Sequence, residues 1–75
     1  MRLAWYIKIN GTKYPVCYEK ILEAFGGGWE CSVPALGRAA YCGWGSSPQR
    51  AYKHLCRVAK HLEEIEKLKK EVKNA

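Results

Sequence analysis

With 75 residues, 48% of them hydrophobic, the chain has room for one domain, residues 1–75, and is too apolar for a disordered segment. Its net charge of +6 arises in residues 1–60, which hold nine Lys and Arg against three Glu, whereas residues 61–75 carry equal numbers of each sign. No apolar run approaches the ~20 residues of a membrane span, which argues against a membrane partner and leads us to expect a cytoplasmic protein.

The first twenty residues predict a β-hairpin. Apolar and polar side chains alternate over residues 2–9, which is the period of a strand with one buried face. The buried side of that strand would comprise Leu3, Trp5, Ile7 and Ile9. Asn10-Gly11 follows as a tight-turn signal, because both residues tolerate positive φ. A return strand runs through residues 14–18, and Pro15, which has no N–H to donate, restricts it to a sheet edge or to a start after the proline.

Residues 18–25 are compatible with two structures. Their apolar side chains recur at i, i+3, i+4 and i+7, and Gly26 stands where a helix often ends, which predicts a short helix. We favour the alternative, a strand to about Lys20 followed by a helical turn over residues 21–25. The three glycines at 26–28 lack the spacing of a phosphate-binding loop, so we interpret them as a chain reversal.

Two more strands complete the predicted sheet, which extends over residues 2–45. Alternation over residues 29–33 indicates the third strand, and Pro34 ends it before a corner at residues 35–37. The fourth strand covers residues 40–44, where small side chains predict that a helix packs closely against the sheet.

A long helix is predicted over residues 47–73. Ser47 before Pro48 is a strong helix start, because serine caps free N–H groups and proline suits the first helical position. No glycine or proline interrupts the chain from there to Asn74. The core-facing stripe would be Ala51, Leu55, Val58, Leu62 and Ile65, widened by Tyr52 and Ala59. The predicted fold is therefore α+β, an antiparallel sheet of three to four strands packed against one long C-terminal helix.

The C-terminal part of this helix is longer than the sheet can cover. A helix of about 26 residues measures ~39 Å, whereas strands of five to seven residues span ~17–23 Å. Residues 63–75 should then overhang the sheet, although they carry the apolar side chains of Ile65, Leu68 and Val72. This segment either mediates dimerisation or forms a frayed tail. We expect a homodimer, because each buried aliphatic side chain contributes ~1.5–3 kcal/mol.

Four cations lie on the helix face opposite the predicted core. We call this set the cationic ridge: Arg50, Lys53, Arg57 and Lys60. His54 flanks the ridge and would add positive charge when protonated, and Trp44 offers an aromatic surface on which a base could stack. The ridge is therefore a candidate binding surface for phosphates or for an acidic partner. The alternative is an ordinary solvated helix face.

The residue types argue against catalysis and metal binding. Outside the helix tail the carboxylates are Glu19, Glu23 and Glu30, too few for a metal-assisted nuclease. The four cysteines contain no Cys-x-x-Cys pair, so we expect no metal, no other cofactor and no small-molecule substrate. A Cys31–Cys42 bridge between strands is geometrically allowed, and buried free thiols are the simpler alternative. We therefore expect a protein that is not an enzyme.

An ordered set of short motifs resembles the HicB-like family of antitoxins. The matching segments are Tyr14-Pro15-Val16 with Glu19-Lys20, Gly27-Gly28-Trp29, Val33-Pro34-Ala35-Leu36-Gly37, and Gly45-Ser46-Ser47-Pro48 with Ala51. They cover about residues 14–62. The helix start departs from the family in charge, because Gln49-Arg50 stands where the family has acidic residues.

The resemblance implies a truncated ribonuclease-H-like fold without the nuclease carboxylates, in a single-domain form lacking the DNA-binding extension that many members carry. HicB-like proteins bind and block a small RNA-cleaving toxin, HicA. By this resemblance the chain would be a non-catalytic module that acts by occluding a protein partner, either a toxin or another nuclease. Two alternatives stay open: a small basic nucleic-acid-binding protein, and a virus-borne or plasmid-borne inhibitor of a nuclease complex.

Overall fold

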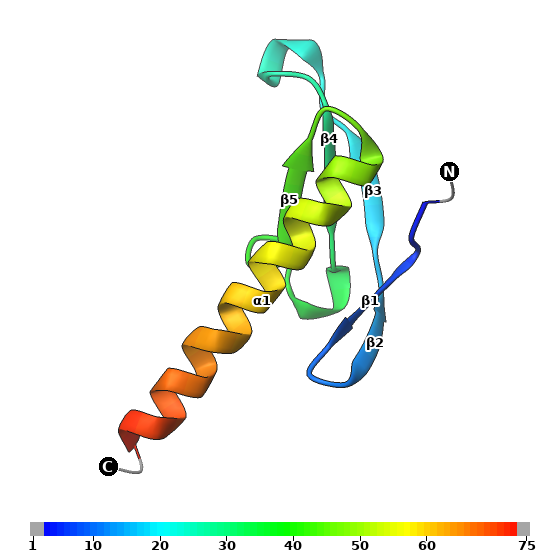
Figure 1. Cartoon of the computed structure of the whole chain (residues 1–75). Coiled ribbons are helices and arrows are strands. Elements are labelled where there is room, and N and C mark those ends of the chain that lie inside the picture. Colours follow the sequence, from blue (N-terminus) through cyan, green and yellow to red (C-terminus); the bar gives the residue numbers. More distant parts are fainter. Residues whose placement is uncertain (1–2, 74–75) are drawn as a thin grey trace.

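The computed structural model describes residues 3–73, and the side chains of residues 3–70. Within them, five short strands and two 3-10 turns precede one long helix (Figure 1). In chain order the elements are β1 (Tyr6–Ile9), β2 (Thr12–Pro15), β3 (Cys17–Lys20), η1 (Glu23–Phe25), β4 (Trp29–Ser32), η2 (Pro34–Leu36), β5 (Cys42–Gly45) and α1 (Pro48–Lys73). The fold is α+β, as predicted, with the strands packed against the C-terminal helix.

Strands β1 and β2 form the predicted hairpin. Asn10 and Gly11 take φ angles of 50° and 81° at the turn, which is the conformation that a two-residue hairpin loop requires. At the open end, Tyr6 lies opposite Pro15. β2 pairs with β1 alone. No strand on its other side needs an N–H from Pro15, so the predicted edge position is confirmed.

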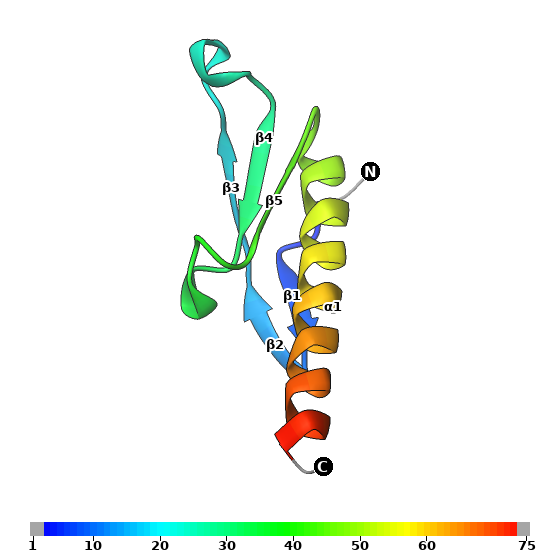
Figure 2. The same ribbon diagram turned by 90° about the vertical axis from the view of Figure 1, so that its left-hand side faces the viewer.

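The sheet that the sequence predicts as one is divided in two. β1 pairs with β2, whereas β3, β4 and β5 form a separate three-stranded antiparallel sheet. The division falls at Val16, whose N–H donates to the carbonyl oxygen of Trp5 at 2.9 Å and whose side chain is buried. From Cys17 onward the chain pairs with β4 instead. β2 runs on almost directly into β3, and β1 lies beside α1 (Figure 2).

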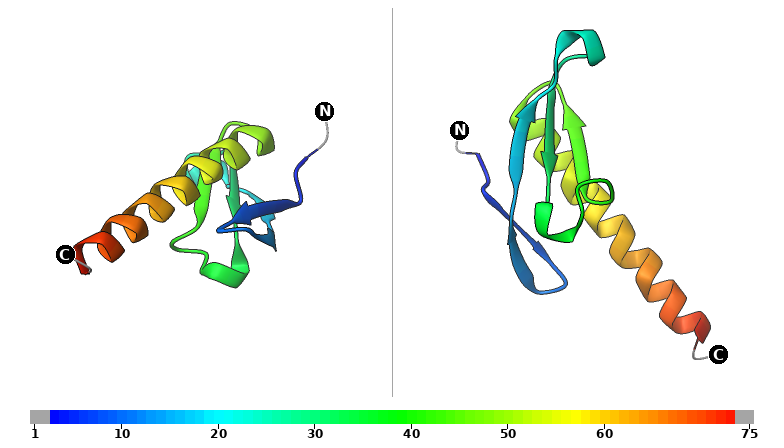
Figure 3. Two further views of the ribbon diagram at one scale, coloured as in Figure 1. Left: turned by 60° about the horizontal axis from the view of Figure 1, so that its bottom comes forward. Right: turned by 180° about the vertical axis from the view of Figure 1, so that it is seen from behind.

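Helix α1 covers one face of the three-stranded sheet (Figure 3). Two glycines of β5 make this contact a close one. A Cβ atom added at Gly43 would lie 2.3 Å from the backbone nitrogen of Leu55, and one at Gly45 would lie 2.6 Å from that of Ala51. The backbones of β5 and α1 therefore touch without intervening side chains, which confirms the close packing predicted from the small residues.

The buried apolar core combines the hairpin, the sheet and α1. Its members are Ile7, Ile9, Val16, Cys31, Val33, Ala51, Leu55 and Ala59. The core residues on α1 are four residues apart, at Ala51, Leu55 and Ala59. The buried stripe is therefore rotated around the helix axis relative to the predicted stripe. Val58 and Leu62 are only half-buried and Ile65 is 36% exposed, so their prediction as core residues is wrong. The rotation follows from the hairpin, which packs against α1 on the side of Tyr52.

Trp5 is a second correction to the predicted core. It was expected on the buried side of the first strand, yet it is 61% exposed. Its ring meets that of Tyr18 edge to face, with 5.8 Å between the centroids. The indole therefore packs at the rim of the core rather than inside it.

Two tyrosine hydroxyls attach the N-terminal segment to the rest of the molecule. Tyr52 of α1 donates to the carbonyl oxygen of Tyr6 at 2.8 Å, and Tyr18 of β3 donates to that of Ala4 at 2.5 Å. Both acceptors belong to the segment that leads into and begins β1. The hydroxyls thus satisfy backbone carbonyls that the hairpin ladder leaves free.

Helix α1 is continuous over Pro48–Lys73, within one residue of the predicted start. The Ser47 hydroxyl caps it by accepting a hydrogen bond from the backbone N–H of Arg50 at 3.3 Å. Further along, the Glu63 carboxylate accepts one from the backbone N–H of Asn10 in the hairpin turn, at 3.0 Å. Beyond this point the helix projects past both sheets (Figure 1), over the part of the predicted overhang that ends at Lys73; residues 74 and 75 lie outside the described residues.

The alternatives for residues 18–25 are resolved in favour of a strand and a turn. β3 continues to Lys20, and η1 forms a single turn over Glu23–Phe25. A helix over 18–25 does not form, because the first residues of this segment pair with β4. The apolar side chains of Leu22 and Phe25 consequently lie at a loop tip, 68% and 79% exposed.

All four cysteines are free thiols. The Cys31–Cys42 bridge does not form: Cys31 lies opposite Gly43 and Cys42 opposite Ser32, so the two thiols emerge from opposite faces of the sheet. Cys31 is buried, whereas Cys17 is exposed, so the expectation of buried thiols holds in part. In the part of the chain that the structure describes, α1 is too polar to cross a lipid bilayer, and no other helix is long enough.

Candidate functional site

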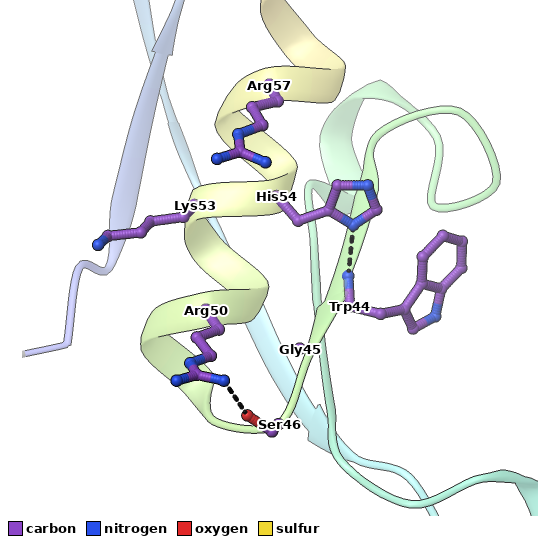
Figure 4. A pocket seen from close by; sticks show the side chains of 7 residues that line it. All are labelled: Trp44, Gly45, Ser46, Arg50, Lys53, His54 and Arg57. Carbon is purple, nitrogen blue, oxygen red and sulfur yellow. Dashed lines mark hydrogen bonds between the residues drawn. The ribbon is translucent and has the colours of Figure 1, made fainter.

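Part of the cationic ridge lines a hollow beside Trp44 (Figure 4). The hollow has a volume of about 550 Å³. Its lining consists of Trp44, Gly45, Ser46, Arg50, Lys53, His54 and Arg57. Three of these side chains are cations and none is acidic. The hollow is therefore a concentrated positive surface with one aromatic wall.

The close approach of β5 to α1 brings these residues together. Gly45 permits it, since a Cβ atom there would lie only 2.6 Å from the Cβ of Arg50. The chain then turns through residues 46–47 and enters α1 at Pro48. Trp44 is thereby placed beside the first turns of the helix, with 53% of its surface exposed.

A hydrogen bond to His54 connects the edge strand of the sheet to the helix. Its Nδ1 atom accepts a hydrogen bond from the backbone N–H of Trp44 at 2.9 Å, and the two rings lie 5.7 Å apart. β5 is an edge strand, so this N–H has no partner strand on that side. Accepting the bond requires an unprotonated Nδ1, which leaves the ring proton on Nε2. His54 therefore holds the backbone of Trp44 in place, and the prediction that it contributes to binding at the ridge stays a prediction.

The four ridge side chains are all exposed. Arg50 donates from Nη1 to the Ser46 hydroxyl at 3.1 Å. Both ion pairs found within residues 3–70 involve Arg38, on the other side of the sheet. Lys60 stands apart from the first hollow and lines another, together with Asn10, Glu63, Glu64 and Lys67. The structure thus groups three ridge cations with Trp44 and places the fourth among acidic neighbours.

The open face of the three-stranded sheet is less positive than the helix face. Glu19 of β3 lies directly opposite Glu30 of β4, an arrangement in which like charges repel. Arg38 bridges them, donating from Nε to Glu30 at 3.2 Å and from Nη2 to the Glu19 carboxylate. The sequence did not reveal this cluster, because it depends on the strand register and on the course of the corner after η2.

The residues predicted for dimerisation lie on the overhanging part of α1. Ile65 is 36% and Leu68 60% exposed, so both are open to a partner. They are three residues apart and share one helix face. The third predicted residue, Val72, has a side chain outside the described residues.

Sequence reasoning missed two members of the hollow, Gly45 and Ser46. A signal for them exists in the alternation of Gly43 and Gly45 immediately before the serines that start the helix. Glycines in that pattern mark a strand approached by another backbone. The two glycines therefore predict which face of β5 lies against the helix. Trp44 stands between them, so its side chain faces away from the helix.

No grouping of three or more His, Cys, Asp or Glu side chains that could hold a metal ion occurs among the residues that the structure describes. Comparison of the chain with protein-family models, with curated proteins and with solved structures found no match. The likeness to HicB-like antitoxins rests on the sequence motifs alone. The geometry of the hollow is therefore the main guide to function.

Proposed function

We propose that this protein is a non-catalytic binding module that holds single-stranded nucleic acid in the hollow lined by the end of β5 and the first turns of α1. One observation carries the proposal: Arg50, Lys53 and Arg57 line the hollow beside a half-exposed Trp44, with no carboxylate in the lining. Single-strand binders combine these two features, a positive groove for the phosphates and an aromatic ring for a base.

The position of Trp44 favours a single strand over a duplex. An indole ring can stack on a base only if that base is not already stacked within a double helix. Such stacking contributes ~1–3 kcal/mol per base and tolerates any base, since every base has a π-face. The hydrogen bond to His54 already holds the backbone of Trp44 in place. Stacking on a base would therefore cost less conformational entropy.

The ridge cations supply the electrostatic part of the binding. Arg50, Lys53 and Arg57 follow one helix face at steps of three and four, so their charges form a row along α1. Like charges at these spacings repel each other in the free protein. Phosphates of a bound strand would remove that repulsion and release counterions. Binding of this kind acts by occlusion, because the covered strand is withheld from other proteins.

The test is the affinity for a fluorescently labelled 16-nucleotide strand, measured by anisotropy over a series of salt concentrations. The three phosphate contacts of this hollow should contribute about −2 to the log–log salt slope, at ~0.7 per contact on single strands. Loss of one stacked base should make Trp44→Ala ~10-fold weaker. Arg57→Glu should also weaken binding at least ~10-fold, because it replaces a contact by a repulsion.

The matched control is Lys70→Glu. It lies on the same helix and makes the same change in net charge, but it is 13 residues from Arg57, ~20 Å along the axis. It should change the affinity by less than about twofold, since screening removes most of its effect over that distance. Equal losses for Arg57→Glu and Lys70→Glu, or no binding by the wild type at low salt, would contradict the proposal.

A protein partner is the second candidate, favoured by the exposed loop tip at η1. Leu22 and Phe25 there are 68% and 79% exposed, and grouped apolar side chains on a surface are typical of protein contacts. In this case the module would occlude a toxin or nuclease, as HicB-like proteins do or as a virus-borne or plasmid-borne inhibitor would.

Co-purification with a co-expressed HicA-type toxin tests this candidate. Phe25→Ser should abolish capture of the toxin and leave oligonucleotide affinity unchanged. If the wild type captures no toxin, or if Phe25→Ser captures it equally well, the loop tip is not the contact.

A further inference from the structure

Two lysines face each other across the β1–β2 hairpin. Lys8 lies directly opposite Lys13 in the ladder, and both side chains are exposed. Like charges in such a cross-strand pair destabilise a sheet. Within residues 3–70 neither lysine forms an ion pair with a carboxylate. The hairpin therefore carries an uncompensated pair of positive charges.

These lysines line a hollow of about 420 Å³ on the hairpin. Its other lining residues are Tyr6, Ile7 and Tyr52. The Nζ atom of Lys13 lies 4.8 Å above the Tyr6 ring, which holds this charge at the hollow. The composition repeats that of the first hollow, with cations beside aromatic rings and no acid in the lining. An anion bound here would relieve the repulsion between Lys8 and Lys13.

The two hollows are lined by consecutive residues of α1. Tyr52 lines the hollow on the hairpin, and Lys53 lines the hollow beside Trp44. In Figure 4 the Lys53 side chain extends from the helix away from Trp44. Lys53 is thus the ridge cation best placed to contact a ligand that occupies both hollows.

We propose that Lys8 and Lys13 form a second phosphate-binding subsite for the same nucleic-acid strand that stacks on Trp44, so that the strand passes over α1 at Lys53. This inference rests on the proposed function and gives the bound strand its path. It also predicts that affinity rises with strand length until both subsites are filled, and then levels off.

Two measurements on the double variant Lys8→Gln/Lys13→Gln test the subsite. Loss of two phosphate contacts should reduce the magnitude of the salt slope by about 1.4 and lower the affinity for a long strand ~20-fold near 0.1 M salt. In a series of oligonucleotides from 4 to 20 nucleotides, its affinity should level off at a shorter length than that of the wild type. Short strands that fill only the Trp44 hollow should bind both proteins equally.

The matched control is Lys67→Gln/Lys69→Gln, which removes the same charge from the overhang of α1 and should leave the slope and the plateau length unchanged. Misfolding is checked by the single variant Lys8→Glu. It turns a repulsive pair into an attractive one, so it should raise the thermal midpoint while lowering the affinity for long strands.

The outcomes separate this inference from the proposed function. If Arg57→Glu abolishes binding while Lys8→Gln/Lys13→Gln keeps the wild-type slope and plateau length, the subsite is wrong and the Trp44 site stands. If the wild type fails to bind any strand at low salt, both are wrong. The subsite is supported if Lys8→Gln/Lys13→Gln has a smaller salt slope and its affinity levels off at a shorter strand length, while the control variant shows neither change.

Discussion

At Gly43 the absence of a side chain sets the distance between β5 and α1. The position lies inside a strand and has an ordinary negative φ, so no unusual backbone conformation demands a glycine there. A glycine is required there for steric reasons, because the backbone of α1 lies where the Cβ atom of any other residue would be. The same contact at Gly45 brings the first turn of α1 to Trp44, so two missing side chains determine the shape of the candidate site.

Gly43→Ala should be strongly destabilising. A methyl group 2.3 Å from the backbone nitrogen of Leu55 forces the strand and the helix apart, and overpacking of this kind costs about 3 kcal/mol. Urea denaturation followed by circular dichroism measures the loss. Gly11→Ala is the control: it has open space around it and φ of 81°, so it should cost ~1–2 kcal/mol through backbone strain alone. A smaller loss for Gly43→Ala than for Gly11→Ala would contradict the backbone contact.

His54 shows how a residue's role depends on its contact. Sequence spacing placed it beside the cations, which made it a candidate member of the binding surface. In the structure its Nδ1 atom is an acceptor for a strand N–H, which a protonated ring cannot be. The position of a histidine on a helix is visible in the sequence, whereas its hydrogen-bond partner is not.

Among the elements, α1 consists of two parts with different surroundings. From Pro48 to Glu63 it is packed against the sheet and the hairpin, and beyond Glu63 it projects with Ile65 and Leu68 exposed. Three Glu at 63, 64 and 66 precede three Lys at 67, 69 and 70. A second copy running antiparallel would align the acidic part of one overhang with the basic part of the other.

We predict that the protein is a dimer at micromolar concentrations and that Ile65→Ser/Leu68→Ser makes it a monomer. Burial of these side chains contributes ~1.5–3 kcal/mol each, and the double variant removes this contribution from both copies. Light scattering coupled to size-exclusion chromatography reports the mass. Lys20→Ser, an exposed position on β3 away from the overhang, is the control and should remain dimeric. A monomeric wild type whose stability is unchanged by deletion of residues 66–75 would contradict the prediction.

Across the whole molecule, the sheet and the helix meet in a layer that contains both thiols and phenols. Burial raises the pKa of the Cys31 thiol to about 11 from an ordinary value near 9. Burial, together with the neighbouring thiols, also raises the pKa of Tyr18 and of Tyr52. Each of these groups therefore keeps its proton in the folded protein at a pH where the unfolded chain has lost it.

The free energy of unfolding should consequently fall as the pH rises from about 9 to 11. Below pH 9 Cys31 is protonated in both states and its full contribution is present. Above pH 9 the unfolded chain ionises first, so stability is lost until the folded pKa is passed. For Cys31 this amounts to ~2–3 kcal/mol. Urea titrations at pH 8, 9, 10 and 11 measure it. Cys31→Ala should flatten the curve between pH 9 and 10, whereas Tyr18 and Tyr52 still lower the stability above pH 10. A wild-type curve that is flat over this range would show that the thiol is not buried as described.

Local interactions account for what could be predicted from the sequence. The Asn10-Gly11 turn, the strand ending at Lys20, the capped start of α1 and the length of the overhang all depend on residues near one another in the chain. Backbone conformational preferences, the loss of an N–H at proline and the rise per residue of a helix are properties of such short segments. For the same reason the cations on one face of α1 could be listed in advance.

Tertiary structure decided the rest, because packing depends on partners that are distant in sequence. The division of the sheet at Val16 and the exposure of Trp5 follow from where the hairpin docks, which no local pattern specifies. The rotation of the buried stripe has the same cause, since the hairpin covers α1 on the side of Tyr52. The hollow beside Trp44 and the facing lysines of the hairpin likewise exist only once strand register and the contact between β5 and α1 are set. Charge and aromatic content were present in the sequence from the start; their assembly into surfaces required the fold.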